Sequence, residues 1–177
     1  MYNITNRHNI AWDDERSRLE ATQYLIRAAL AYLPERMCTK NAIALLIATG
    51  MQESRFVYTR QINGPARGYW QFESGGGLIG IMSHVSSKDH LKNVTKRFDL
   101  PWDRTTLFKR IEEDRLFAAI CARLLYFTDR MEIPAATYEN EQEAWVYYIR
   151  NWRPGKPRRS SWHRFWRMAC DVVNGKL

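Results

Sequence analysis

The sequence has few cysteines, no long apolar run and no glycine motif of a phosphate-binding loop. Cys38, Cys121 and Cys170 stand far apart, with no other Cys or His at metal-ligand spacing. This argues against both a zinc site and a disulfide framework, and we expect three reduced, mostly buried thiols. The longest apolar run, 42–48, is far shorter than the roughly 20 residues of a membrane-spanning helix. Gly75-Gly76-Gly77 precedes no Lys-Ser or Lys-Thr, so no phosphate loop is predicted.

A signal peptide is also missing from the sequence pattern, because the first twenty residues are polar and include Asp13, Asp14 and Glu15. We therefore expect synthesis in the cytoplasm without a signal peptide. The length of 177 residues and the hydrophobic content of 45% fit one globular domain with a sizeable core. We predict an N-terminal arm over residues 1–18 and a single domain over residues 19–177.

Acidic residues are absent from residues 144–170, where seven cations account for most of the net charge of +8. The segment also holds four tryptophans. Cations among aromatic side chains suit either nucleic acid or an anionic cell-wall or envelope surface. A terminal helix with its Trp face on the core and its Arg face in solvent has the same pattern. The cations are Arg150, Arg153, Lys156, Arg158, Arg159, Arg164 and Arg167, and the tryptophans are Trp145, Trp152, Trp162 and Trp166.

Hydrophobic periodicity predicts a mainly α chain. The run 42–48 is apolar on every side, so its helix, capped by Thr39, should be central. Residues 58–80 contain too many glycines and prolines for a helix and predict an irregular loop or short β-hairpin. The other predicted helices are one that ends before Pro34, a short one after Ser87, a long one over 105–129, and two over 139–152 and 161–173.

Glu53 is a candidate general acid because it follows the apolar run directly after a short polar tip. A carboxyl group at the end of a buried helix is partly desolvated and faces the negative end of the helix dipole. Both effects favour the protonated form, so we expect a raised pKa, which a general acid at neutral pH requires. On residue statistics alone, the alternative is an exposed glutamate in a fraying last turn.

Three blocks of sequence give Glu53 a functional context. They are Gln-Glu-Ser-Arg-Phe at 52–56, Ala-Arg-Gly-Tyr-Trp-Gln-Phe at 66–72, and Asn-Trp-Arg-Pro-Gly at 151–155. In this order they resemble the Glu-Ser, Gly-Leu-Met-Gln and Tyr-Asn-Ala-Gly signatures of lytic transglycosylases with the goose-type lysozyme fold. The resemblance covers about residues 39–156 and implies a lysozyme-like helical domain with the irregular or hairpin loop near its active-site cleft.

The resemblance implies that Glu53 protonates the glycosidic oxygen between N-acetylmuramic acid and N-acetylglucosamine and then accepts the proton of the muramyl 6-hydroxyl. It also implies that Ser54 hydrogen-bonds nearby to orient Glu53 and that Gln71 lines the cleft. Tyr69 and Trp70 replace the family's Leu-Met pair and could offer faces to sugar rings; the alternative for both is a place in the core.

The third block departs from the family pattern at one position. If Asn151 matches the family Asn, Arg150 stands where the family has a Tyr that bonds the catalytic carboxylate. Tyr147 or Tyr148 lies about one helical turn earlier and is the candidate replacement. The orienting partner of Glu53 is therefore left open between these two tyrosines.

Glu73 is a second departure, because it follows the Gln block directly, where the family has an apolar residue or Pro. A second carboxylate that faces the first is how hydrolytic glycosidases hold a nucleophile or activate water. A lysozyme-type muramidase that uses Glu53 and Glu73 is therefore the near alternative. A solvated loop residue is the other interpretation of Glu73.

The resemblance implies peptidoglycan glycan strands as the substrate, an anionic wall surface as a partner, and no metal ion or other cofactor. Without a signal peptide, the pattern resembles bacteriophage endolysins and virion-associated bacteriolytic enzymes, so we expect action on the bacterial cell wall and contact with other virion proteins. The rival from another class is a nonenzymatic protein, either nucleic-acid-binding or a virion structural component. Nucleic acid is the less favoured partner.

Overall fold

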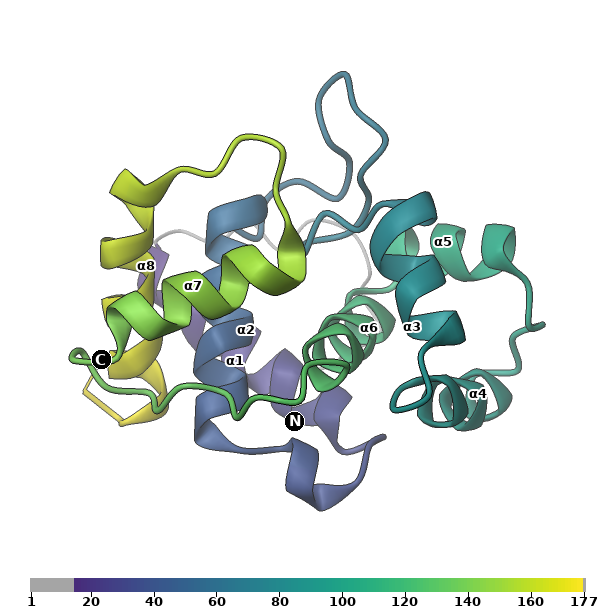
Figure 1. The fold of residues 1–177 in the computed structure, drawn as a ribbon, viewed down its shortest axis with the longest axis horizontal. Helices are drawn as coiled ribbons and strands as arrows, with labels where there is room; N and C mark the ends of the chain where they lie inside the picture. Colours follow the sequence, from purple (N-terminus) through teal and green to yellow (C-terminus); the bar gives the residue numbers. More distant parts are fainter. Residues whose placement is uncertain (1–14, 177) are drawn as a thin grey trace.

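The computed structural model describes residues 15–176, which are mainly α-helical, and this confirms the predicted fold class at that level. Single turns of 3-10 and π helix occur at Glu35–Met37 and Ser74–Leu78. None of the helices in the described range could cross a membrane. The α-helices, labelled as in Figure 1, are α1 (Glu15–Leu30), α2 (Lys40–Glu53), α3 (Ile79–Ser83), α4 (Lys88–Arg97), α5 (Arg104–Glu113), α6 (Arg115–Phe127), α7 (Glu141–Trp152) and α8 (Arg159–Val173).

The predicted N-terminal arm lies mostly outside the described residues, which begin at position 15. Residues 15–18 form the first turn of α1, and Leu19 in the next turn is fully buried. The helix therefore begins inside the segment predicted as an arm. It ends at Leu30, before Pro34, as expected from the fixed φ of proline.

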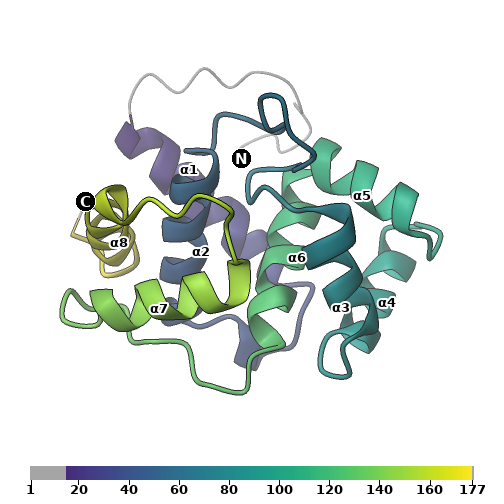
Figure 2. The same cartoon turned by 45° about the horizontal axis from the view of Figure 1, so that its top comes forward.

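Helix α2 is the central helix, as its composition predicts. Ten consecutive residues, 42–51, are buried, so no side of the helix faces water over this stretch. The side chain of Thr39 accepts a hydrogen bond from the amide of Ala42 at 3.1 Å, which confirms the predicted cap. α2 packs against α8, α1, α6 and α7. Figures 1 and 2 show α7 and α8 on one side of α2, with α3, α4 and α5 on the other side, beyond α6.

Helix α8 turns its aromatic side chains to the core. Trp162 and Trp166 are fully buried, and Phe165 and Cys170 are nearly so. Arg164 and Arg167 on the same helix are exposed. The packed alternative for the basic aromatic segment therefore holds for these tryptophans. Of the three free thiols, those of Cys121 and Cys170 are buried and that of Cys38 is partly buried, as predicted.

The segment 105–129 is two helices, and the prediction of one long helix was wrong. Asp114 has extended backbone angles (φ −124°, ψ 105°), which end α5 and begin α6. Its carboxylate accepts hydrogen bonds from the amides of Leu116 at 3.0 Å and Phe117 at 3.2 Å. Asp competes with the helix in this way because its side chain replaces the missing backbone acceptors at a helix start.

Residues 54–73 form a long loop between α2 and the turn before α3 (Figure 1). It contains two isolated antiparallel bridges, between Arg60 and Arg67 and between Arg67 and Phe72, and the described residues include no β-strand. The loop prediction extended too far, because Gly75–Gly77 lie in the π-helical turn that leads into α3. Glycine is tolerated there because other helices hold the turn in place.

The break at Asp114 predicts a measurable contribution to stability. Asp114→Ala leaves two amides at the start of α6 without their acceptor and also removes an ion pair with Arg110 at 3.5 Å. The lost cap alone should lower the free energy of unfolding by about 1 kcal/mol. Urea unfolding followed by circular dichroism measures the change. The control is Glu113→Ala, which removes an exposed ion pair with Lys109 (3.7 Å) worth less than about 0.5 kcal/mol. Equal losses in the two variants would contradict the capping role.

Candidate active site

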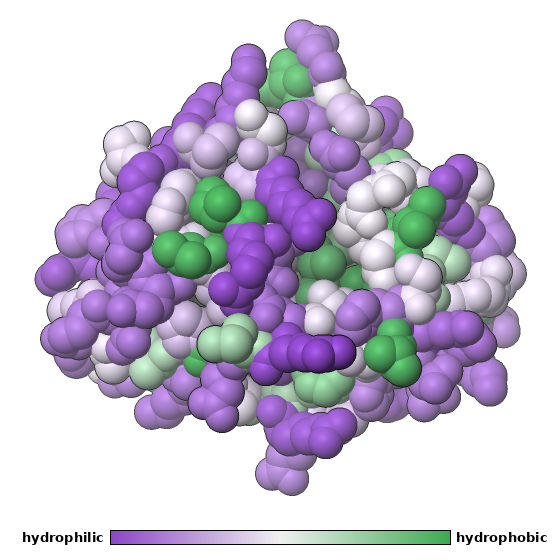
Figure 3. Space-filling view, viewed as in Figure 1, coloured by the Kyte–Doolittle hydropathy of each residue, from purple (hydrophilic) through white to green (hydrophobic). Residues whose placement is uncertain are grey.

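Glu53 is the last residue of α2, at the point where the buried helix reaches the surface. Its side chain is partly buried, and its Oε1 accepts a hydrogen bond from the hydroxyl of Tyr148 in α7 at 2.5 Å. The face of the molecule seen in Figure 1 is hollowed near its centre, between the part that carries α7 and the part that carries α3 (Figure 3). Helices far apart in sequence therefore meet around this carboxyl group.

The pKa of Glu53 is raised to about 7, in the predicted direction. Burial is the largest cause, because it disfavours the charged carboxylate. The hydrogen bond from Tyr148 opposes the rise by stabilising the ionised form, and the negative charge of Glu73 adds to it. Near neutral pH both forms of Glu53 are populated, so this group can give up a proton and also take one back.

Tyr148 is held in place by aromatic packing. Its ring stacks on Trp162 of α8, with centroids 4.8 Å apart and planes 16° apart, and Trp145 contacts both rings at 5.5 Å. Trp162 in turn stacks on Trp166 at 6.2 Å. Burial and the adjacent Glu53 hold the pKa of Tyr148 well above its ordinary range. The hydroxyl therefore remains a donor to Glu53 at all physiological pH values.

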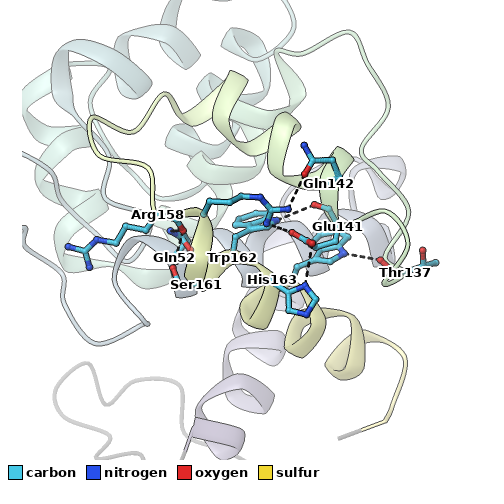
Figure 4. Close-up of polar contacts among 10 residues, drawn as sticks. Gln52, Thr137, Glu141, Gln142, Arg158, Ser161, Trp162 and His163 are labelled. Atoms are coloured by element: carbon cyan, nitrogen blue, oxygen red, sulfur yellow. Dashed lines mark hydrogen bonds and ion pairs between the residues drawn. The ribbon is translucent and has the colours of Figure 1, made fainter.

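Polar contacts fix the other side of this stack, as Figure 4 shows. The indole nitrogen of Trp162 donates to the carbonyl of Glu141 at 3.3 Å. The Glu141 carboxylate forms an ion pair with Arg159 and lies 3.3 Å from a ring nitrogen of His163. Trp166 donates to the carbonyl of Thr137 at 2.8 Å. The beginning of α7 is thus tied to α8, and this sets the position of Tyr148.

Gln52 ties the end of α2 to the beginning of α8. Its amide nitrogen donates to the carbonyl of Arg158 at 3.0 Å, and its amide oxygen accepts from the hydroxyl of Ser161 at 3.0 Å (Figure 4). Because Gln52 precedes Glu53 directly, these two bonds restrict the backbone that carries the acid. No sequence pattern predicted this contact, which joins residues 106 and 109 positions apart.

Ser54 caps α2 and holds the loop that follows, but no described contact joins it to the Glu53 side chain. Its hydroxyl donates to the carbonyl of Tyr69 at 2.6 Å and accepts from the amide of Phe56 at 3.1 Å. The ring of Phe56 returns onto α2 so closely that a Cβ at Gly50 would lie 2.1 Å from it. Ser54 therefore holds the backbone at the end of α2, and the expected hydrogen bond that would orient the Glu53 side chain is not among its contacts.

Tyr69 and Trp70 are core residues, which corrects their assignment as faces for sugar rings. Trp70 is fully buried, and its indole nitrogen donates to the carbonyl of Leu46 at 2.9 Å. Tyr69 is 4% exposed and packs edge-on against Phe56 at 5.6 Å. An aromatic ring can stack on a sugar only if one face is accessible, and these two faces are covered by protein.

Gln71 and Glu73 lie at the end of the loop, with different degrees of constraint. The amide nitrogen of Gln71 donates to the carbonyl of Gly68 at 2.8 Å, so the side chain supports its own tight turn, where φ is 50°. No described contact joins it to Glu53. Glu73 is exposed, and its charge acts on Glu53. The structure therefore places Glu73, but not Gln71, in electrostatic contact with the acid.

Tyr147 and Asn151 face away from Glu53, so the choice left open between the two tyrosines falls on Tyr148. The Tyr147 hydroxyl donates to the carbonyls of Tyr126 and Met131 at 3.2 and 3.1 Å. Asn151 donates to Asp129 at 2.8 Å, and Arg150 forms an ion pair with the same carboxylate at 2.7 Å. The two residues therefore stabilise the end of α7, and no described contact makes either of them part of the acid's surroundings.

Tyr126 was missed as a neighbour of the acid, and Trp152 packs on it. The hydroxyl of Tyr126 is 2.5 Å from that of Thr49, and the pKa of this buried tyrosine is raised, in part by Glu53. Trp152 packs on Tyr126 at 5.0 Å and donates to the carbonyl of Trp70 at 3.0 Å. No sequence pattern singled out Tyr126, and Trp152 was placed in the basic aromatic segment; only the helix packing brings these two rings together.

Other hollows of the described surface are separate from this chemistry. One of about 380 Å³ is lined by Tyr138 and Cys170, among others, and one of about 230 Å³ by Arg123 and Tyr147, among others. Neither is lined by Glu53. Within the described residues, no group of three or more His, Cys, Asp or Glu side chains could hold a metal ion.

No family model, curated protein or solved structure matches this chain. Functional inference therefore depends on the geometry around Glu53 and on the three sequence blocks. Of the predicted site residues, Tyr148 bonds to Glu53, and the charge of Glu73 raises the pKa of Glu53. The contacts of Ser54, Tyr69, Trp70, Tyr147 and Asn151 support the protein framework.

The bond from Tyr148 predicts a change in the pKa of Glu53. Tyr148→Phe removes a donor that stabilises the carboxylate, so the pKa of Glu53 should rise above about 7. Carbon-detected NMR titration of the glutamate carboxyl groups measures this directly. Tyr147→Phe is the control, because it removes a hydroxyl from the neighbouring position without touching Glu53. A downward shift in Tyr148→Phe would contradict the hydrogen-bond assignment.

The same pKa predicts how stability depends on pH. Between pH 4.5 and 7 the unfolded chain ionises Glu53 while the folded chain keeps it protonated, so wild type loses stability as pH rises through this window. Glu53→Gln removes that loss. Relative to wild type, the variant should therefore gain roughly 2 to 3 kcal/mol in free energy of unfolding from pH 4 to pH 8. Urea unfolding at both pH values measures it, with Glu113→Gln as the control that should show no such gain.

Proposed function

We propose that this protein is a peptidoglycan lytic transglycosylase that cleaves the bond between N-acetylmuramic acid and N-acetylglucosamine. The observation that carries the proposal is the carboxyl group of Glu53, partly buried at the end of an apolar helix, with a pKa near 7 and a fixed donor in Tyr148. The match of the blocks 52–56 and 66–72 to the family signatures supports the same assignment. No metal ion or cofactor enters the proposed reaction.

In the proposed mechanism, protonated Glu53 gives its proton to the glycosidic oxygen as the bond from that oxygen to muramyl C1 breaks. The carboxylate that forms is stabilised by the Tyr148 hydroxyl at 2.5 Å. It then accepts the proton of the muramyl 6-hydroxyl as that oxygen bonds to C1. Glu53 ends protonated, and the product carries a 1,6-anhydro ring. A pKa near 7 suits both proton transfers at neutral pH.

A muramidase is the second candidate, and the effect of Glu73 on Glu53 favours it. In that reaction Glu73 would activate water or bind C1, and the product would have a reducing end. We favour the transglycosylase because Glu73 is exposed and none of its described contacts fixes its carboxylate. A catalytic base or nucleophile needs to be held within a few tenths of an ångström of its working position.

The site of action in this proposal is the bacterial cell wall, and a phage lysis or virion-associated role follows from the resemblance alone. The nonenzymatic rivals make a distinct prediction, because neither a nucleic-acid-binding protein nor a virion structural protein releases sugars from the wall. Buried Trp162 and Trp166 also offer no free face for a nucleic-acid base. Turnover of purified wall therefore separates these classes of function.

Product analysis tests the proposal. Mass spectrometry of sacculi digested by wild type should show anhydro ends, which are lighter than reducing ends by one water molecule. Glu53→Gln should reduce turnover by at least about a thousandfold, because the amide cannot deliver a proton. Glu73→Gln should stay within about threefold of wild type, as should the exposed control Glu113→Gln.

Reducing ends together with a large loss in Glu73→Gln would replace the transglycosylase by the muramidase. Full activity of Glu53→Gln would remove Glu53 from the chemistry. No release of sugars by folded wild type would favour the nonenzymatic class.

A further inference from the structure

The connector between α7 and α8, residues 153–158, carries three exposed cations, Arg153, Lys156 and Arg158. Among the described residues, no ion pair joins any of the three to a carboxylate. The remaining cations of the basic segment have partners: Arg150 pairs with Asp129, Arg159 with Glu141, Arg164 with Glu15, and Arg167 lies 4.0 Å from the centre of the Tyr138 ring.

The connector lies beside the acid. It passes over the end of α2 in both Figure 1 and Figure 2. The carbonyl of Arg158 accepts the hydrogen bond from Gln52, the residue before Glu53. Figure 4 shows the Arg158 side chain extending away from these contacts. The connector backbone that carries these charges is therefore held beside the residue that precedes Glu53, while Arg153 Nε donates to the carbonyl of Arg150 at the end of α7 at 3.3 Å.

The backbone that presents these cations is constrained. Pro154 and Pro157 fix two φ angles, and the bonds from Gln52 and Ser161 hold the carbonyl of Arg158. Such a backbone presents charge at a set place, which reduces the entropy lost when a ligand binds. Mutual repulsion among exposed cations without acidic partners is relieved when an anionic ligand lies between them.

We infer that the connector binds the carboxylates of the short peptide attached to the muramyl residue, so that the protein selects strands whose peptides are charged. This inference rests on the proposed function and adds a specificity site to it. Sugar rings bound at Glu53 would carry the attached peptide past the end of α2, where the connector backbone is hydrogen-bonded to Gln52. Carboxylates are the groups that Arg and Lys recognise by charge-assisted hydrogen bonds.

The probe is a pair of soluble, uncross-linked glycan strands with attached peptides, one untreated and one with its peptide carboxylates converted to primary amides. The two differ in charge and have the same sugars. Binding is measured by calorimetry with Glu53→Gln, which cannot cleave, and turnover is measured with otherwise wild-type protein. We expect amidation to weaken binding and to lower kcat/KM by about tenfold at low salt, and by less than about twofold at 0.5 M salt.

Matched variants locate the effect. Arg153→Gln/Lys156→Gln/Arg158→Gln should lose the preference for charged strands and keep the rate on amidated ones. Arg153→Lys/Arg158→Lys retains the charge and should retain most of the preference. The control Lys88→Gln/Lys96→Gln/Arg104→Gln removes the same charge from exposed positions on α4 and α5 and should behave as wild type. Thermal melting checks that every variant is folded.

The outcomes separate this inference from the proposed function. Equal binding and equal cleavage of the two strands by wild type would overturn the inference and leave the transglycosylase standing. Charge-dependent binding without cleavage would support the connector site and overturn the enzyme. If the control variant lost the preference for charged strands to the same degree, net charge and not a local site would explain the preference, and the inference would be overturned. Salt-sensitive binding to DNA that exceeds binding to the strands would overturn it in favour of nucleic acid.

Discussion

Helix α2 is apolar around its whole circumference over residues 42–48 and buried over residues 42–51, so it is stable only where other helices cover all of its sides. This requirement accounts for much of the architecture. α1, α6, α7 and α8 all pack against α2. The first ionisable residue after the apolar stretch is Glu53. The packing that stabilises the helix is thus also the cause of the desolvated carboxyl group.

Two opposing effects set the pKa of Glu53. Burial favours neutral Glu53, whereas the donor at 2.5 Å favours its anion, and the balance places the pKa near neutrality. Tyr148 is buried with its ring stacked on Trp162, which stacks in turn on Trp166, and this packing supports the side chain that donates to Glu53. Three of the four tryptophans that suggested a nucleic-acid surface, Trp145, Trp162 and Trp166, instead belong to the packing around the Tyr148 side chain.

The sequence predicted features that depend on neighbouring residues and missed those that depend on how helices turn relative to one another. The apolar run and the Thr39 cap were predictable because both are local. The break at Asp114 was missed because the helical spacing of apolar residues continues both before and after it. Tyr147 and Tyr148 differ by about 100° around α7, and only the rotation of that helix decides which one reaches Glu53. Trp70 was misjudged because an aromatic residue in a glycine-rich loop looks the same whether it faces water or the core.

The bond between Glu53 and Tyr148 spans 95 positions of the chain, and the bond between Gln52 and Ser161 spans 109. Contacts of such long range form late, because the entropy of a large loop is lost before the contact compensates for it. During translation, Glu53 is synthesised long before Tyr148, Trp162 and Trp166. A nascent or truncated chain that ends before α8 therefore carries the carboxyl group without its support, and the complete site exists only once α8 has been made.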